Sequence, residues 1–131
     1  MSANFSVMFL DDDSYLLSAY QRMLRGVPFH CVFEQSCRRA HNYLGSHSVS
    51  LLLADYLMPE QSGLEFCQHK ANWMQPTRCY LLSAMHEPLL FKQAEQDSVI
   101  QGVLAKPITK SELLAFLHQQ QHELLIRNFQ E

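Results

Sequence analysis

The sequence predicts an α/β fold, a doubly wound parallel sheet of five strands with five helices. Short apolar runs alternate with segments in which apolar residues repeat at helical spacing. The connections are short, and this alternation is typical of parallel strands covered by helices on both faces. With 47% hydrophobic and 18% charged residues, the 131-residue chain can bury one core. We therefore expect a single domain, residues 1–131, with its core at about 5–129.

The five strands are predicted from apolar runs that end at polar residues or turn formers. Their ranges are 5–10, 29–33, 49–54, 78–82 and 99–105. Only Ser50 interrupts the third run, which is the pattern of a strand buried on both faces. Gln101 and Gly102 weaken the fifth.

The five helices are predicted over 13–25, 36–44, 64–74, 88–97 and 109–128. The first carries an apolar stripe and ends before Gly26 and Pro28, which are helix breakers. Gly45 is predicted to end the second, because glycine is the usual residue just past a helix.

The third and fifth helices have their own signals. Cys67, Ala71 and Met74 lie at helical spacing and would form the buried face of the third. Thr109 and Glu112, three residues apart, form the sequence signature of a capping box at the start of the fifth.

Polar side chains follow the predicted strands at their carboxyl ends, where open α/β sheets bind ligands. Because the strands are parallel, these side chains should meet at one edge of the sheet. The chain has five aspartates, and four of them lie at these ends. The residues at the strand ends are Asp11, Asp12 and Asp13, then Asp55, then Ser83, and finally Lys106.

This set of side chains suits phosphoryl transfer with a divalent cation. Clustered carboxylates repel one another, and oxygen ligands favour Mg²⁺, or Mn²⁺, which would relieve the repulsion. A carboxylate beside the ion can attack a phosphoryl group, and Lys106 and Ser83 could contact the phosphoryl oxygens. Alternatively, Asp11 and Asp12 could cap the first helix, although Asp13 is better placed as its cap.

Four short motifs stand in order, each at a strand end. They are FLDD at 9–12, DYLMP at 55–59 with Gly63, LSA at 82–84 and KP at 106–107. Together they resemble the receiver domain of two-component response regulators, in particular the chemotaxis regulators. The resemblance spans about residues 6–129 and implies a flavodoxin-like sheet with strand order 2-1-3-4-5.

The resemblance implies a role for each residue of the site. Asp55 would accept a phosphoryl group from a phosphohistidine on a sensor histidine kinase or phosphotransfer protein. Asp11 and Asp12 would hold Mg²⁺, Asp12 more directly. Asp55 and the backbone carbonyl of Leu57 would be further ligands.

The remaining motif residues would position the phosphoryl group and its loops. Ser83 and Lys106 would engage phosphoryl oxygens and draw the following loops inward. Met58, Pro59 and Gly63 would shape the loop after the acceptor. Proline disfavours a helical conformation at the residue before it, and glycine at position 63 permits a positive φ.

Phosphorylation would add roughly −1.5 to −2 charges, by analogy with phosphorylated hydroxyl residues, and bias a surface formed by the last two helices and the fifth strand. Members of the resembled family usually have Tyr or Phe three residues before the lysine, but this chain has Val103. We expect the switch to act differently, through Tyr80 or Phe91, or to be weakly coupled to phosphorylation.

Leu57 lies two residues after the acceptor Asp55, and Met85 lies two residues after Ser83. Both are apolar, and we therefore predict slow autodephosphorylation.

The predicted signalling switch would catalyse only its own phosphoryl transfer and dephosphorylation and would not otherwise be an enzyme. Two other functions remain open. One is a pseudo-receiver, a protein-binding module that keeps the fold without phosphorylation, since Val103 departs from the family. The other is a Mg²⁺-dependent phosphatase of the haloacid dehalogenase type. Such an enzyme needs an acidic pair after the lysine, and no aspartate follows Lys106.

Composition argues against other partners. A net charge of −3 gives no basic surface for nucleic acid. No apolar stretch approaches the roughly 18 residues of a membrane span, and no signal peptide is expected. The four cysteines lack metal or disulfide spacing, which favours a cytoplasmic location. Expected partners are the phosphodonor and a downstream protein or fused output domain. The end of the last helix could serve either as a packing surface or as the contact of a homodimer.

Overall fold

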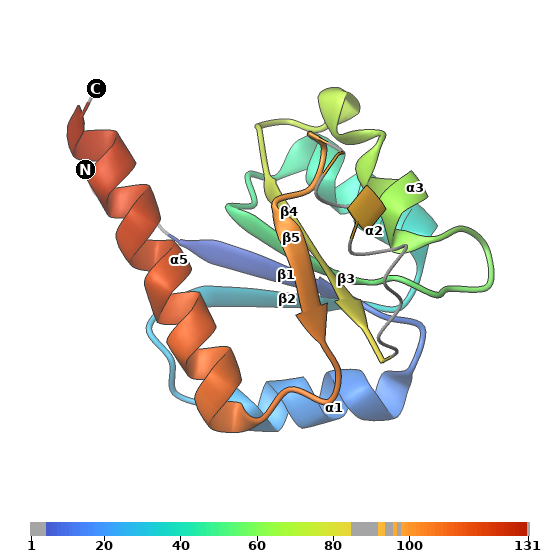
Figure 1. Cartoon of the computed structure of the whole chain (residues 1–131), viewed down its shortest axis with the longest axis horizontal. Coiled ribbons are helices and arrows are strands. Elements are labelled where there is room, and N and C mark those ends of the chain that lie inside the picture. Colours follow the sequence, from blue (N-terminus) through green and yellow to red (C-terminus); the bar gives the residue numbers. More distant parts are fainter. Residues whose placement is uncertain (1–4, 85–91, 94–95, 97, 131) are drawn as a thin grey trace.

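The computed structural model describes residues 5–84, 92, 93, 96 and 98–130. Within these residues, five strands form one parallel sheet in the order β2-β1-β3-β4-β5 (Figure 1). The predicted fold class and strand order are therefore confirmed. The strands are β1 (Ser6–Leu10), β2 (His30–Glu34), β3 (Leu51–Asp55), β4 (Arg78–Ser83) and β5 (Gly102–Ala105).

Four α-helices and one short 3₁₀ helix accompany the sheet in the described part of the chain. They are α1 (Ser14–Met23), α2 (Cys37–Ser46), α3 (Gly63–Cys67), η1 (Lys70–Asn72) and α5 (Lys110–Gln130). The predicted helix at 88–97 lies largely outside the described residues. None of the described helices is both long and apolar enough to cross a membrane.

The sheet is buried on both faces. Helices α1 and α5 cover one face, and α2 and α3 cover the other (Figure 1). Successive residues of β1 point to opposite sides, so Phe9 packs under α1 and α5 whereas Met8 packs under α2 and α3. All residues of β1 and β3 are buried, which explains why both strands are apolar apart from Ser6 at the start of β1 and Asp55 at the end of β3.

Two helix starts follow the capping patterns of the sequence. Asp13 Oδ1 accepts hydrogen bonds from the backbone N–H groups of Tyr15 (3.0 Å) and Leu16 (3.3 Å). At the start of α5, Thr109 Oγ1 accepts from Glu112 N–H (3.1 Å), and Glu112 Oε1 accepts from Thr109 N–H (2.9 Å). Asp13 is thus the cap of α1, and the two aspartates before it are not needed for that purpose.

Helix α2 does not end at Gly45, contrary to the prediction. The helix continues through this residue to Ser46, whose hydroxyl donates to Asn42 O (3.1 Å). The N–H of His47 then donates to Tyr43 O (2.8 Å), which completes the last turn without a left-handed glycine. By contrast, Gly26 has a φ of 87° in the turn after α1, as a helix stop requires.

The third helix is much shorter than the predicted range of 64–74. Helix α3 has five residues and ends at Cys67, and the separate 3₁₀ helix η1 follows it. Met74, expected on the buried face, is 58% exposed, whereas Trp73 is only 7% exposed. The indole ring packs against Phe66 with ring centroids 5.5 Å apart. The larger aromatic group takes the core position because it buries more apolar surface than methionine.

Candidate functional site

The carboxyl ends of β1, β3, β4 and β5 surround a cavity of about 340 Å³. Backbone hydrogen bonds extend the parallel ladder past the strand ends and hold the site residues in place. The N–H of Asp11 donates to Glu34 O of β2 (3.1 Å), and the N–H of Lys106 donates to Ser83 O of β4 (2.8 Å). The cavity is lined by Asp11, Asp12, Asp13, Asp55, Tyr56, Leu57, Ser83, Ala84 and Lys106.

The structure brings together all the side chains that the sequence placed at strand ends. Tyr56 and Ala84 also line the cavity, although no role was predicted for them. Their positions directly after Asp55 and Ser83 were the signal available in the sequence. Ser83 itself is 6% exposed.

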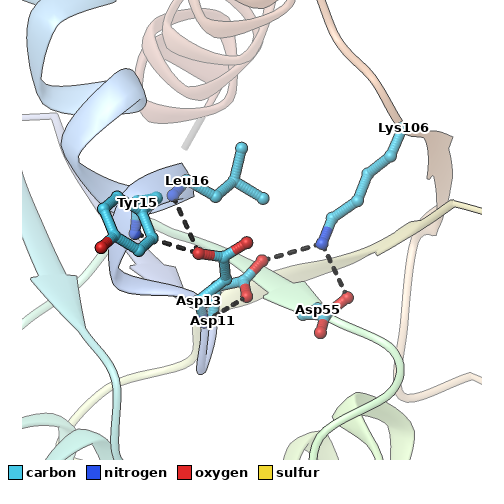
Figure 2. Close-up of polar contacts among 6 residues, drawn as sticks. All are labelled: Asp11, Asp13, Tyr15, Leu16, Asp55 and Lys106. Atoms are coloured by element: carbon cyan, nitrogen blue, oxygen red, sulfur yellow. Dashed lines mark hydrogen bonds and ion pairs between the residues drawn. The ribbon is translucent and has the colours of Figure 1, made fainter.

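Lys106 lies between two buried carboxylates (Figure 2). Its Nζ donates to Asp11 Oδ2 at 2.8 Å and to Asp55 Oδ1 at 2.9 Å. The side chains of Lys106, Asp11 and Asp55 are 15%, 3% and 12% exposed. Ion pairs this well shielded from water interact more strongly than surface pairs, and removing one partner leaves a buried charge.

Asp11 and Asp12, which follow β1, differ in their burial and hydrogen bonds. Asp11 Oδ1 accepts the N–H of Asp13 (2.9 Å), so both of its oxygens are engaged once Lys106 is included. Asp12 is exposed at the mouth of the same cavity. One oxygen from each of Asp11, Asp12 and Asp55 lies within 4.8 Å of the others.

The concentration of charge shifts the pKa values of the paired groups. Burial raises the pKa of Asp55, and the Asp11 carboxylate adds to this, while the hydrogen bond from Lys106 opposes it. For Lys106, burial lowers the pKa, but the hydrogen bonds to both carboxylates outweigh it, so the pKa is raised. Asp55 is therefore a carboxylate whose charge the protein only partly compensates.

The donor set fits a hard divalent cation. Three carboxylates and one ammonium group leave an excess of two negative charges at neutral pH, which one Mg²⁺ or Mn²⁺ would balance. Asp11, Asp12 and Asp55 are the side chains that would hold it. Leu57 also lines the cavity, and the contribution of its backbone carbonyl stays a prediction.

Gly63 is needed for close packing and not for a positive φ. Among the glycines of the described chain, only Gly26 has a positive φ, so that part of the prediction is wrong. A Cβ on Gly63 would collide with the backbone carbonyl oxygen of Asp55 and would lie 3.0 Å from Leu81. The missing side chain lets the first turn of α3 sit directly on the end of β3.

We expect Gly63→Ala to lower the free energy of unfolding by about 1–3 kcal/mol, because the backbone of Asp55 must move to admit the methyl group. Urea denaturation measures this change. Gly45→Ala is the matched control, since an added Cβ there has no neighbour within 4 Å and helix propensity improves. A Gly63→Ala variant as stable as the parent would contradict the packing.

Val103 and Tyr80 lie on opposite faces of the sheet. Val103 pairs with Leu81 in register and packs on the cluster under α2 and α3. Tyr80 packs under α5, with its ring 4.8 Å from that of Phe116 and its hydroxyl accepting a hydrogen bond from Gln120 (3.2 Å). Tyr80 therefore does not occupy the place that an aromatic ring at position 103 would take.

The other residues predicted to shape the loops have varied surroundings. Met58 is half-buried and packs on the cluster under α2 and α3, whereas Pro59 is exposed. Leu57 is 62% exposed. Met85 and Phe91, to which the sequence assigned roles in dephosphorylation and switching, lie outside the described residues.

The chain thus combines a flavodoxin-like sheet with an acidic cavity at the carboxyl ends of its strands. Residues 7–118 match the family model described as the response regulator receiver domain. Because this match covers most of the chain, the protein belongs to the response regulator receiver domain family.

Individual relatives are distant. The heme response regulator HssR of Staphylococcus saprophyticus is 28% identical over 61 residues, which are 47% of this chain and 27% of the relative. The receiver domain of an HD domain-containing protein from Pseudomonas fluorescens has a TM-score of 0.80 at 23% identity, covering 92% of this chain and 99% of that one. A CheY-like receiver domain from Methanospirillum hungatei has a TM-score of 0.81 at 13% identity, covering 92% and 96%. At such low sequence identity, the similarity to these two solved structures shows the fold alone.

Proposed function

We propose that Asp55 accepts a phosphoryl group from a phosphohistidine on a sensor kinase or phosphotransfer protein, with Mg²⁺ bound beside it. One observation supports this most strongly. The Asp55 carboxylate ends a buried strand, lies close to two further carboxylates and is hydrogen-bonded to Lys106. Membership of the receiver family supports a phospho-accepting signalling domain, and the donor and the ion are our proposals.

In the proposed reaction, a carboxylate oxygen of Asp55 attacks the phosphorus atom and the N–P bond of the phosphohistidine breaks. Bound Mg²⁺, held by Asp11, Asp12 and Asp55, would neutralise charge on the phosphoryl oxygens. Lys106 already contacts Asp55 and would transfer its hydrogen bond to a phosphoryl oxygen. Ser83 lines the same cavity and would donate to another.

The output of this reaction is a shift in a protein-binding surface. The phosphoryl group would carry a charge of about −1.5 to −2 in place of the single negative charge of the carboxylate. It would draw Lys106 away from Asp11, and Lys106 directly follows β5. A downstream protein or a fused output domain would read the change. A homodimer through the last helices, a cytoplasmic location, slow autodephosphorylation and the absence of other enzymatic activity stay predictions.

The test is incubation of the full chain with acetyl phosphate and Mg²⁺, followed by intact mass spectrometry. We expect one phosphoryl adduct that is lost in Asp55→Asn and kept in Asp13→Asn, because Asn caps a helix as well as Asp does. An unmodified parent chain would favour the pseudo-receiver. Continuous hydrolysis of acetyl phosphate that depends on Asp11 and not on Asp55 would favour the phosphatase.

A further inference from the structure

A second cluster of titratable and aromatic side chains lies between α2 and the segment that follows α3. It surrounds a cavity of about 410 Å³ that shares no residue with the acidic one. The ring of His41 stacks on Phe66 with centroids 4.0 Å apart, and the ring of His69 meets it edge-on at 5.5 Å. The cavity is lined by His41, Gln61, His69, Asn72 and Trp73.

A side-chain hydrogen bond fixes the protonation state of His41. The indole Nε1–H of Trp73 donates to His41 Nδ1 at 3.2 Å. An indole N–H can only donate, so Nδ1 must carry a lone pair and the ring proton of the neutral imidazole is on Nε2. This tautomer leaves no lone pair on Nε2, and the His41–His69 pair is therefore not arranged to bind a metal ion.

We propose that the His41–Trp73 contact is an acid-sensitive latch that holds residues 68–74 against α2. A proton from solvent would add to His41 Nδ1, the atom that accepts the indole hydrogen bond. Two N–H donors would then face each other, so the hydrogen bond would be lost and the charged ring would turn away from Phe66 toward the cavity. His41 lines that cavity and is only partly buried, so solvent can reach its ring.

The latched segment is tied to two other parts of the fold. The N–H of Met74 donates to Leu44 O at 2.8 Å, at the end of α2. Lys70 Nζ donates to Val99 O at 2.8 Å, in the chain that leads into β5. Release of Trp73 would therefore loosen a segment that connects α2 with the chain leading into β5, the strand that Lys106 follows.

The surroundings of His41 keep the latch closed at neutral pH. Burial lowers the pKa of His41, and the neighbouring His69 lowers it further. The charged groups on the packed elements are directed elsewhere: Arg38, one turn earlier on α2, is exposed, and Glu65 on α3 accepts the N–H of Ser62.

The lowered pKa of His41 makes stability depend on pH. Below the usual histidine pKa of about 6.5, the folded state binds fewer protons than the unfolded chain. Stability contributed by the latch is lost as the pH falls from that value through the lowered pKa.

Trp73 is the one tryptophan of the chain, so its fluorescence reports directly on this contact. We expect a single change in emission between pH 8 and about pH 4.5, with its midpoint below about 6.5. His41→Gln should abolish the transition, and His69→Gln should move its midpoint upward. His47→Gln, at an exposed histidine just after the same helix, is the matched control and should leave the transition unchanged.

An emission that stays constant over this range, or a transition that persists in His41→Gln, would overturn the latch. If His41→Gln does not fold, the ¹⁵N shifts of the His41 ring in the unchanged chain decide the question. We expect Nε2 protonated and Nδ1 unprotonated at pH 8. The opposite tautomer would exclude the hydrogen bond on which the latch depends.

Discussion

Replacing Lys106 with methionine is expected to lower the free energy of unfolding by roughly 3–5 kcal/mol at pH 7 in metal-free buffer. The substitution keeps the length of the side chain but leaves the carboxylates of Asp11 and Asp55 buried without their shared counter-charge. Urea denaturation in the presence of a chelator measures the loss. Added Mg²⁺ should restore part of it, because the ion would replace the missing positive charge.

The matched control is Lys110→Met, at an exposed lysine in the first turn of α5. It should change stability by less than about 0.5 kcal/mol. Equal stabilities for the two variants would contradict the central position of Lys106 in the site.

The pH dependence of this loss has a definite sign. Lys106 has a raised pKa, so its contribution is present at pH 7 and is lost as the pH rises above about 10.4 and through the folded value. In Lys106→Met, the pKa of Asp55 should rise further, because its hydrogen bond to Lys106 opposed the rise. Stability of the variant should therefore increase as the pH falls from that raised pKa toward the ordinary value of about 3.9.

Asp12→Asn is expected to remove most of the stabilisation that Mg²⁺ gives while changing metal-free stability little. Asp12 is exposed, and one of its oxygens lies within 4.8 Å of those of the other two carboxylates. Unlike Asp11 and Asp55, it is not buried against Lys106, so replacing it should disturb the folded structure least. An ion at a hundred times its dissociation constant should stabilise the parent by about 2.7 kcal/mol. The variant should gain less than about 1 kcal/mol at the same concentration. Thermal unfolding with and without Mg²⁺ measures both values.

Asp13→Asn is the control for this experiment, because it changes the adjacent carboxylate of the same triplet but preserves the cap of α1. It should keep the full response to Mg²⁺. Loss of the response in Asp13→Asn together with its retention in Asp12→Asn would contradict the assignment of ligands.

The sequence was sufficient to predict which side chains meet in the acidic cavity, because two regular patterns determine their positions. Apolar runs located the strands, and parallel strands place their carboxyl ends at one edge. Asp11, Asp55 and Lys106 consequently meet although Lys106 and Asp11 are 95 residues apart. The cap at Asp13 and the capping box of α5 are local patterns and were equally predictable.

What the sequence did not predict depends on packing between distant elements. Helical spacing favoured Met74 as a core residue, but tertiary packing buries Trp73 instead. The hydrogen bond from Trp73 to His41 joins residues 32 apart in sequence, and no periodic pattern signals it. Likewise, the reason for glycine at position 63 is the approach of the Asp55 carbonyl, which belongs to another element.

The identity of the phosphorylated residue is the most direct test of the proposed function. After reaction with acetyl phosphate and Mg²⁺, borohydride reduction converts a phosphoaspartate into homoserine, which peptide sequencing by mass spectrometry locates. We predict homoserine at Asp55 alone. Homoserine at Asp11 or Asp12 would contradict the role assigned to Asp55, and so would a phosphoryl group found on a histidine.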